Sequence, residues 1–300
     1  MEAVYLTMIR PMIEYGSILF DNCSMADSDR LEGVQRRAAC LCTGAIRRTN
    51  TVKLMEEVGW ESLEIRRKKS KLVLLYVLSN RSGPEYLNRL VAFAPPQSRV
   101  TRYRAHNNRL FLQPFCRLVC YQRSFFPSCI GQWNRLSSSV VNASSLCIFK
   151  KLLSTEVGSN VKVLSSIDYV NTTVGHNGKI ITQIRLGLSP LNAHLFEYKI
   201  INNPFCLHCK NVPETALHYF CICPGYLTMR CTLLSDLSEI VTMLSNNLNI
   251  FVNLNCNDSI VKILLGGCSS LHTDKMMVKC INLKIFKAVS HFMSGTRRFM

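Results

Sequence analysis

Acidic residues are scarce in this chain. Its 300 residues include only 19 Asp and Glu against 36 Lys and Arg, which gives a formal net charge of +17. A positive excess of this size raises the local concentration of polyanions, and counterion release makes a phosphate backbone the natural partner. An acidic membrane surface is the alternative, but it requires an amphipathic basic helix or a juxtamembrane basic cluster, and neither is obvious in the sequence. We therefore predict RNA or single-stranded DNA as the partner, with no membrane and no small-molecule substrate.

Long hydrophobic runs are also absent. No segment reaches the roughly 18 uninterrupted apolar residues that mark a membrane-spanning helix, and the longest run, Leu72 to Leu78, has the length of a core helix. The first residues show neither the basic region nor the small-residue cleavage site of a secretory signal. We therefore expect an intracellular protein, in the cytoplasm and nucleus, whose 15 cysteines are mostly reduced. Their odd number and irregular spacing also argue against a disulfide framework.

Catalytic signatures are missing as well. The sequence has no glycine-rich phosphate loop, no Gly-x-Ser-x-Gly and no His-Glu-x-x-His. A polymerase holds two magnesium ions with carboxylates, usually an adjacent Asp pair, and this sequence has no such pair. Asp27 and Asp29 are close together, but they stand at a predicted helix N-terminus, where capping and the helix dipole account for them. We therefore predict that the chain is not catalytic by itself.

Helix signals outnumber strand signals, and hydrophobic residues make up 48% of the chain, so we predict a folded, mainly α protein. One helix is predicted to be capped by Asp27 or Ser28, to present Leu31, Val34, Ala38 and Leu41 on one face and to stop at Gly44. Two more are predicted from Thr51 to Val58 and, capped by Ser62, to about Ser79. Composition divides the chain into a helical region (1–95), a basic, aromatic-rich connector (96–153), a linker (154–179), a cysteine-rich region (180–232) and a helical tail (233–300).

Arginines and aromatic residues alternate in the connector. No acidic residue occurs between Tyr86 and Thr155. Arginine forks match phosphate oxygens and aromatic faces stack on bases, although Phe125, Phe126 and Trp133 are expected in the core. A second basic block, Arg66 to Lys71, is either a ridge that faces RNA or a solvated helix face. The predicted nucleic-acid contacts are Arg66, Arg67, Lys68, Arg102, Arg104, Arg109 and Arg123.

Residues 204–226 hold the one constellation that indicates metal chemistry. Cys206 and Cys209 form a Cys-x2-Cys pair, and after eight intervening residues His218 and Cys223 form a His-x4-Cys pair that one helical turn would present on the same side. Three thiolates and an imidazole make the closed tetrahedral set of a structural zinc site. A unit this small would depend on the metal for folding. The alternative is a group of buried free cysteines beside a chance histidine.

Several neighbours leave the details of this site open. His208 and Cys221 are close enough in sequence to replace one of the four predicted ligands. Aromatic rings flank the site and could either stack on bases or pack the knuckle; they belong to Phe205, Tyr219, Phe220 and Tyr226. The sequence alone does not distinguish base stacking from packing for these aromatic residues.

Segments at both ends of the chain and around the cysteines resemble non-LTR retrotransposon reverse transcriptases of the jockey/CR1-like kind. Arg10-Pro-Met-Ile-Glu-Tyr-Gly16 is similar to a pattern on a thumb helix just after the polymerase palm, and Arg185-Leu-Gly-Leu-Ser-Pro-Leu-Asn192 is similar to the lead-in of the zinc knuckle. The other similar segments are Leu31–Ala39, Gly59–Leu63, Arg66–Arg67, Asn107–Leu110, Arg123–Pro127, Trp133–Ser137 and Ile285–Phe299.

The resemblance implies a thumb, a connector and a zinc-binding C-terminal region of an RNA-directed DNA polymerase. Such parts would grip template RNA and target DNA during target-primed synthesis. The endonuclease, fingers and catalytic palm of the family are expected upstream of the segments that match. Two alternatives stay open: an active reverse transcriptase whose catalytic portion is missing from this sequence, and a non-functional copy of an element.

Overall fold

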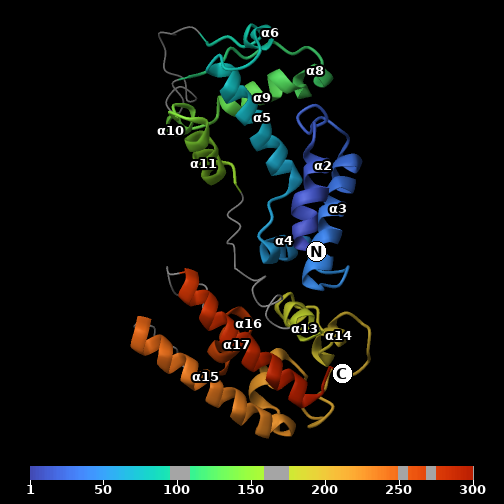
Figure 1. Cartoon of the computed structure of the whole chain (residues 1–300). Helices are drawn as coiled ribbons and strands as arrows, with labels where there is room; N and C mark the ends of the chain where they lie inside the picture. The colour runs from blue at the N-terminus through green and yellow to red at the C-terminus, as the bar shows by residue number, and fades with distance from the viewer. Residues whose placement is uncertain (95–108, 159–175, 249–255, 268–274, 300) are drawn as a thin grey trace. The chain divides into compact units, whose positions relative to one another are not determined.

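The computed structural model describes residues 1–94, 109–158, 176–248, 256–267 and 275–299. Helices supply the regular structure of these residues, together with two isolated β-bridges, Phe93 to Phe111 and Phe205 to Pro213. The prediction of a mainly α fold is confirmed (Figure 1). Within the same ranges, no helix combines the length and the apolar character needed to cross a bilayer.

The chain packs into two compact units. The knuckle unit comprises Met1–Glu2, Arg36–Trp60 and Lys162–Met300, and the α5 unit comprises Ala3–Gln35 and Glu61–Val161. One boundary between them falls inside α3 (Met25–Thr43). These units differ from the five segments that composition predicts, and most of the predicted linker over 154–179 lies outside the described residues.

The α5 unit is built around α5 (Leu63–Ser79), which packs against α9 (Phe125–Trp133) and α11 (Leu146–Glu156). Trp133 is fully buried in this core, as predicted, and its Nε1 donates to the carbonyl oxygen of Arg109 at 2.9 Å. Phe125 and Phe126 are partly buried against the same core. The other helices of this part of the chain are α1 (Glu2–Val4), η1 (Tyr5–Ile9), α2 (Arg10–Glu14), α6 (Glu85–Asn88), α8 (Val119–Arg123) and α10 (Ser138–Val141).

Two of the three predicted helices have the expected bounds. α4 (Thr51–Val58) and α5 begin and end where the sequence predicts, and Ser62 Oγ caps α5 by accepting from Ile65 N at 3.3 Å. The predicted start of α3 was wrong, because Ser24 precedes the helix and its Oγ accepts from Asp27 N at 3.2 Å. Asp27 and Ser28 therefore belong to the first turn of α3 rather than to its cap.

The buried face of α3 also differs from the predicted one. Leu41 is 66% exposed, whereas Gln35, Ala39 and Thr43 are buried. Gln35 is buried without an unpaired amide because its Oε1 accepts from the Tyr5 hydroxyl at 2.8 Å and its Nε2 donates to the Glu61 carbonyl at 2.9 Å. Hydrophobic periodicity misses this face because a fully hydrogen-bonded polar residue occupies it.

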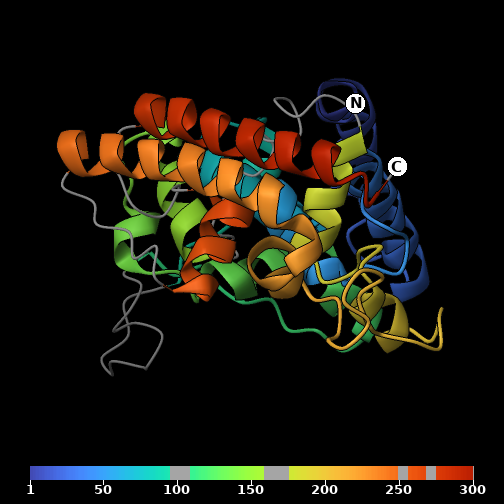
Figure 2. The ribbon, with the colours of Figure 1, turned by 90° about the horizontal axis from the view of Figure 1, so that it is seen from below.

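The core of the knuckle unit lies along α15 (Leu227–Leu248) and α17 (Lys275–Thr296), which run side by side (Figures 1 and 2). The two helices are antiparallel: Met229, near the start of α15, packs against Gly295, and Met243 accepts from Lys284 Nζ at 3.4 Å. Residues of the cysteine-rich region join the same core. The remaining helices of the unit are α4, α13 (His176–Arg185), α14 (Asn192–Glu197), η2 (His218–Ile222), η3 (Pro224–Tyr226) and α16 (Asn257–Gly266).

Candidate metal centre

The four predicted ligands come together in the knuckle unit. The Sγ atoms of Cys206, Cys209 and Cys223 and a ring nitrogen of His218 all lie within 4.8 Å of one another. Cys206 Sγ is 3.6 Å from Cys223 Sγ, and Cys209 Sγ is 3.3 Å from His218 Nε2. Three of these residues are buried and Cys209 is partly buried. The cluster can therefore hold a metal ion with four protein ligands.

The first ligand pair lies on a tight turn that the backbone closes. Cys206 N donates to the Val212 carbonyl at 2.9 Å, and Lys210 N donates to the Cys206 carbonyl at 3.0 Å. Lys210 has a φ of 59°, the left-handed conformation in which glycine is usual. The chain therefore reverses directly after Cys209, which leaves both sulfur atoms of the pair facing the cluster.

The second ligand pair depends on a π-helical turn. Cys223 N donates to the carbonyl oxygen of His218 at 2.8 Å, five residues earlier, at the end of η2. In an α-helix, residues five apart point about 140° apart around the axis. A π turn contains one more residue, and its hydrogen bond ties the residue five positions later back to the first. The predicted helical turn is present, and its π geometry is what allows a His-x4-Cys pair to share one ion.

A buried arginine from α15 supports this π turn. Arg230 is 7% exposed, and it donates from Nε to the Phe220 carbonyl at 2.9 Å and from Nη2 to the Cys223 carbonyl at 2.5 Å. Three thiolates around a divalent cation carry a net negative charge, which a nearby guanidinium offsets. The sequence does not reveal this role, because Arg230 has no ligand spacing to the cysteines.

Glu214, between the two ligand pairs, connects the site to distant segments. Its fully buried carboxylate accepts from Arg298 Nε and Nη2, each at 2.6 Å, and from Asn192 N at 2.9 Å. The side chain of Asn192 donates in turn to the carbonyl of Phe205 at 2.6 Å. The hydrogen bonds to Glu214 raise the pKa of Arg298 although burial opposes this. The guanidinium therefore stays charged and holds the C-terminal segment against the knuckle.

Burial disfavours the charged form of two of the candidate ligands. It lowers the pKa of His218, so the imidazole is neutral at neutral pH, which is the form that binds a metal. It raises the pKa of Cys223 to about 11, so this thiol loses its proton only when a cation takes the proton's place. Metal binding at this site is therefore expected to release protons.

The possible substitute ligands lie outside the cluster. The ring of His208 packs edge-on against Tyr226 with 4.7 Å between centroids, and Cys221 Sγ lies 3.8 Å from the carbonyl oxygen of Asn257. Tyr226 is buried, as are Tyr219 and Phe220, whereas Phe205 is 40% exposed. Three of the four flanking aromatic residues therefore pack the knuckle, and Phe205 is accessible for stacking.

Carboxylates of the α5 unit form ion pairs with the basic block on α5. Arg67 is 4% exposed, and its guanidinium donates to Asp21 at 3.3 Å and to Ser28 at 2.9 Å. This buried, ion-paired position does not favour a contact of Arg67 with nucleic acid, which stays a prediction. Arg66 pairs with Glu14, and Lys68 pairs with Glu64 at 2.6 Å. The block is therefore an ion-paired helix face rather than an open ridge of positive charge.

The other residues predicted to contact nucleic acid differ in their surroundings. Arg102 and Arg104 lie outside the described residues. Arg109 donates to the Val141 carbonyl at 3.2 Å and lies over the ring of Phe93, which ties it to the α5 unit. Arg123 is exposed in the last turn of α8. Among the predicted contacts that the structure describes, Arg123 is thus the best placed to meet a ligand.

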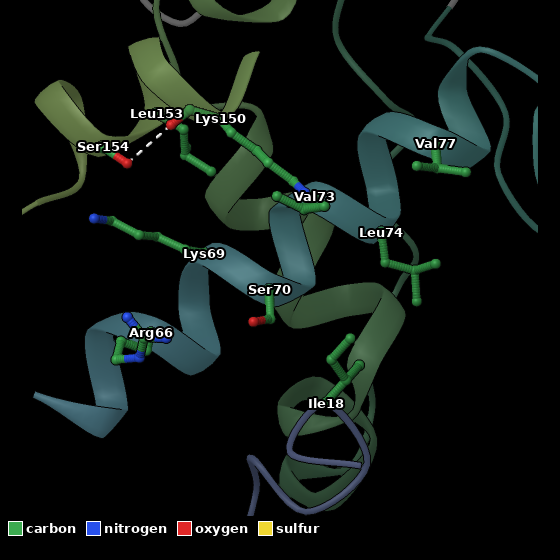
Figure 3. Close-up of a pocket in the computed structure, with 10 residues that line it drawn as sticks. All are labelled: Ile18, Arg66, Lys69, Ser70, Val73, Leu74, Val77, Lys150, Leu153 and Ser154. Atoms are coloured by element: carbon green, nitrogen blue, oxygen red, sulfur yellow. Dashed lines mark hydrogen bonds between the residues drawn. The ribbon is translucent and has the colours of Figure 1, made fainter. Parts of the chain in front are cut away.

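A pocket of about 490 Å³ opens beside α5. Side chains of α5 and α11 supply most of its lining, and Ile18 completes it (Figure 3). Its aliphatic residues include Val73 and Leu74. Two of its three cations, Arg66 and Lys69, have the carboxylate partners Glu14 and Glu61, and the third is Lys150 of α11. A largely aliphatic lining does not suit an extended phosphate backbone, so the pocket is not part of the candidate nucleic-acid surface.

Compared with known proteins, the chain matches no protein-family model, no curated protein and no solved structure. The geometry and chemistry of the metal cluster, together with the charge of the chain, are therefore the basis for assigning a function.

Proposed function

We propose that the cluster is a structural zinc site. Zinc bonds of about 2.3 Å to sulfur and about 2.0 Å to nitrogen imply tetrahedral edges of about 3.8 Å between sulfur atoms and about 3.5 Å between sulfur and nitrogen. Two of the separations at the cluster, 3.6 Å between Cys206 Sγ and Cys223 Sγ and 3.3 Å between Cys209 Sγ and His218 Nε2, are close to these values, and all four atoms lie within 4.8 Å of one another. Four protein ligands leave no position for a catalytic water, so the expected role of the metal is to hold the knuckle together.

The whole chain, in this proposal, is a nucleic-acid-binding C-terminal fragment of a non-LTR retrotransposon RNA-directed DNA polymerase. It would grip template RNA or target DNA and would not be catalytic by itself. The carrying observation is the four-ligand cluster in a chain of net charge +17. Further support comes from Glu214, because the residues that it binds belong to two of the segments that carry the family resemblance: Asn192 in the lead-in and Arg298 at the C-terminal end.

Binding to single-stranded nucleic acid tests this function. We expect the zinc-loaded chain to bind both a poly-U and a poly-dT oligonucleotide of about 20 nucleotides, with affinity falling steeply as salt rises, because each phosphate contact on a single strand contributes about 0.7 to the logarithmic salt slope. Fluorescence anisotropy at a series of salt concentrations measures this slope. Lack of binding, or binding that is indifferent to salt, would refute the proposal.

A further inference from the structure

The end of α3, the turn after it and the start of α4 form a basic stretch of the knuckle unit. Between Glu32 and Glu56 there is no acidic residue. The basic residues of the same stretch are Arg36, Arg37, Arg47, Arg48 and Lys53. A similar basic block, Arg66 to Lys71, lies on α5. Each cation of that block forms an ion pair with a carboxylate. The α3–α4 segment has no such local partners in sequence.

The turn that carries Arg47 and Arg48 is held in a defined conformation. Arg36 donates from its guanidinium to the carbonyl of Arg47 and, at 3.0 Å, to that of Thr49. Thr49 N donates to the Ile46 carbonyl at 2.9 Å and closes the turn. One arginine is thus used to fix the backbone that presents two others.

Both flanks of this turn are anchored as well. Asn50 Oδ1 caps α4 by accepting from Val52 N at 2.9 Å and from Lys53 N at 3.3 Å. Gly44 ends α3 with a φ of 72°, and its carbonyl accepts from Gln183 Nε2 of α13 at 2.9 Å. The stem of Lys179, also on α13, packs directly against Gly44. A fourth cation is therefore brought next to the end of α3 by a contact that needs glycine there.

The cations of this surface point to solvent without carboxylate partners. Arg37, Arg47, Arg48 and Lys179 are all exposed. None of them forms an ion pair with any residue in the described part of the chain. Adjacent like charges repel each other, and water alone screens them here. An ordered turn that keeps two arginines side by side is suited to an anionic partner with more than one charge.

We infer that the Arg47–Arg48 turn, with Arg37 and Lys179 beside it, is a contact surface for the phosphate backbone of a bound single strand. This inference rests on the proposed nucleic-acid function and assigns residues to it that sequence reasoning did not select. Arginine forks bind phosphate oxygens in a bidentate manner, and successive phosphates offer the repeated charge that neighbouring arginines require. Contacts to phosphate groups do not distinguish one base from another, so we expect this surface to bind RNA and DNA alike.

The test is the salt dependence of binding by the R47A/R48A variant of the full zinc-loaded chain. Loss of two phosphate contacts should lower the logarithmic salt slope for a poly-U oligonucleotide by about 1.4 and weaken binding roughly 25-fold at 0.1 M salt. The control is R30A/R89A, which removes the same charge from two arginines whose side chains are 82% and 75% exposed on the α5 unit. It should change the slope little. Zinc content and far-UV circular dichroism check the fold, and R47Q/R48Q replaces the alanine variant if that variant misfolds.

Each outcome has a distinct meaning. If the wild-type chain does not bind the oligonucleotide, the proposed function fails and this inference fails with it. If the wild-type chain binds but R47A/R48A keeps its slope, or if both double variants lose binding equally, the proposed function stands and the assignment of this surface is overturned. Phosphatidylserine vesicles form a second arm: binding to vesicles that depends on Arg47 and Arg48, with no binding to the oligonucleotide, would also overturn it in favour of a membrane partner.

Discussion

Replacing Cys223 with Ser should release the metal and unfold the knuckle unit. Cys223 is fully buried and ends the π turn that also positions His218. Structural zinc contributes about 10–16 kcal/mol to the folding of zinc-finger peptides. The entire stability of a domain is about 5–15 kcal/mol. Even a partial loss of the metal's contribution is therefore expected to exceed what the remaining core of the unit supplies.

Two measurements on the full chain test the effect of Cys223→Ser on the metal content and on the folding of the knuckle unit. Zinc per chain, measured by mass spectrometry of the metal, should fall from one to well below one, and amide hydrogen exchange should show loss of protection in α15 and α17 while α5 and α9 stay protected. Cys231→Ser is the matched control, because Cys231 is exposed on α15 of the same unit. A C223S protein that keeps its zinc and its protection would show that Cys223 is not a ligand that the unit requires, and a wild-type chain without zinc would show that the cluster is only a group of cysteines beside a histidine.

The substitute ligands provide a second comparison within the same experiment. His208→Ala and Cys221→Ser should both keep one zinc per chain, because the two side chains contact Tyr226 and the Asn257 carbonyl rather than the cluster. Loss of zinc from either variant would mean that the ligand set differs from Cys206, Cys209, His218 and Cys223.

Replacing Arg298 with Ala should lower the free energy of unfolding of the knuckle unit by about 3–5 kcal/mol. The reason is that the fully buried side chain of Glu214 would lose both hydrogen bonds from the guanidinium and would be left without its charged partner. Arg298 also donates to Asn192 Oδ1 at 3.1 Å and to the Pro190 carbonyl at 3.2 Å, so the lead-in segment loses its anchor as well. Urea denaturation followed by far-UV circular dichroism measures the change.

The neighbouring arginine is a close control for this prediction. Arg297 is exposed, and Arg297→Ala removes the same side chain one residue away. We expect that variant to change the free energy of unfolding by no more than about 0.5 kcal/mol. Equal stabilities of the R298A and R297A proteins would show that the Glu214–Arg298 pair does not stabilise the unit.

The features predicted correctly from the sequence depend on local spacing. α4 and α5 have the expected bounds because a cap and a stop lie at either end of an uninterrupted helical pattern. The sequence predicts the grouping of the four candidate ligands because each pair occupies a single turn, so the spacing within each pair constrains where the sulfur and nitrogen atoms can lie. The spacing favours His218 and leaves His208 as a substitute, and the structure places His218 in the cluster and His208 against Tyr226.

The features that the sequence missed depend on distant partners. In the sequence, Arg67 belongs to a run of basic residues. In the structure it pairs with Asp21, which lies 46 residues earlier in the chain. Glu214 and Arg298 are 84 residues apart, and nothing near either one in the sequence indicates that they pair. Arg47 and Arg48 illustrate the opposite case. The density of charge around them in the sequence is lower than on α5, yet neither forms an ion pair with a residue that the structure describes.

Cobalt(II) substitution tests most directly whether these four side chains hold one metal. We expect one cobalt ion per chain, with visible ligand-field bands of the intensity that tetrahedral coordination gives and with charge-transfer bands from three thiolates. One equivalent of zinc should abolish both sets of bands. A weak spectrum of octahedral type, or cobalt binding that Cys206→Ser and Cys223→Ser leave unchanged, would contradict the metal centre.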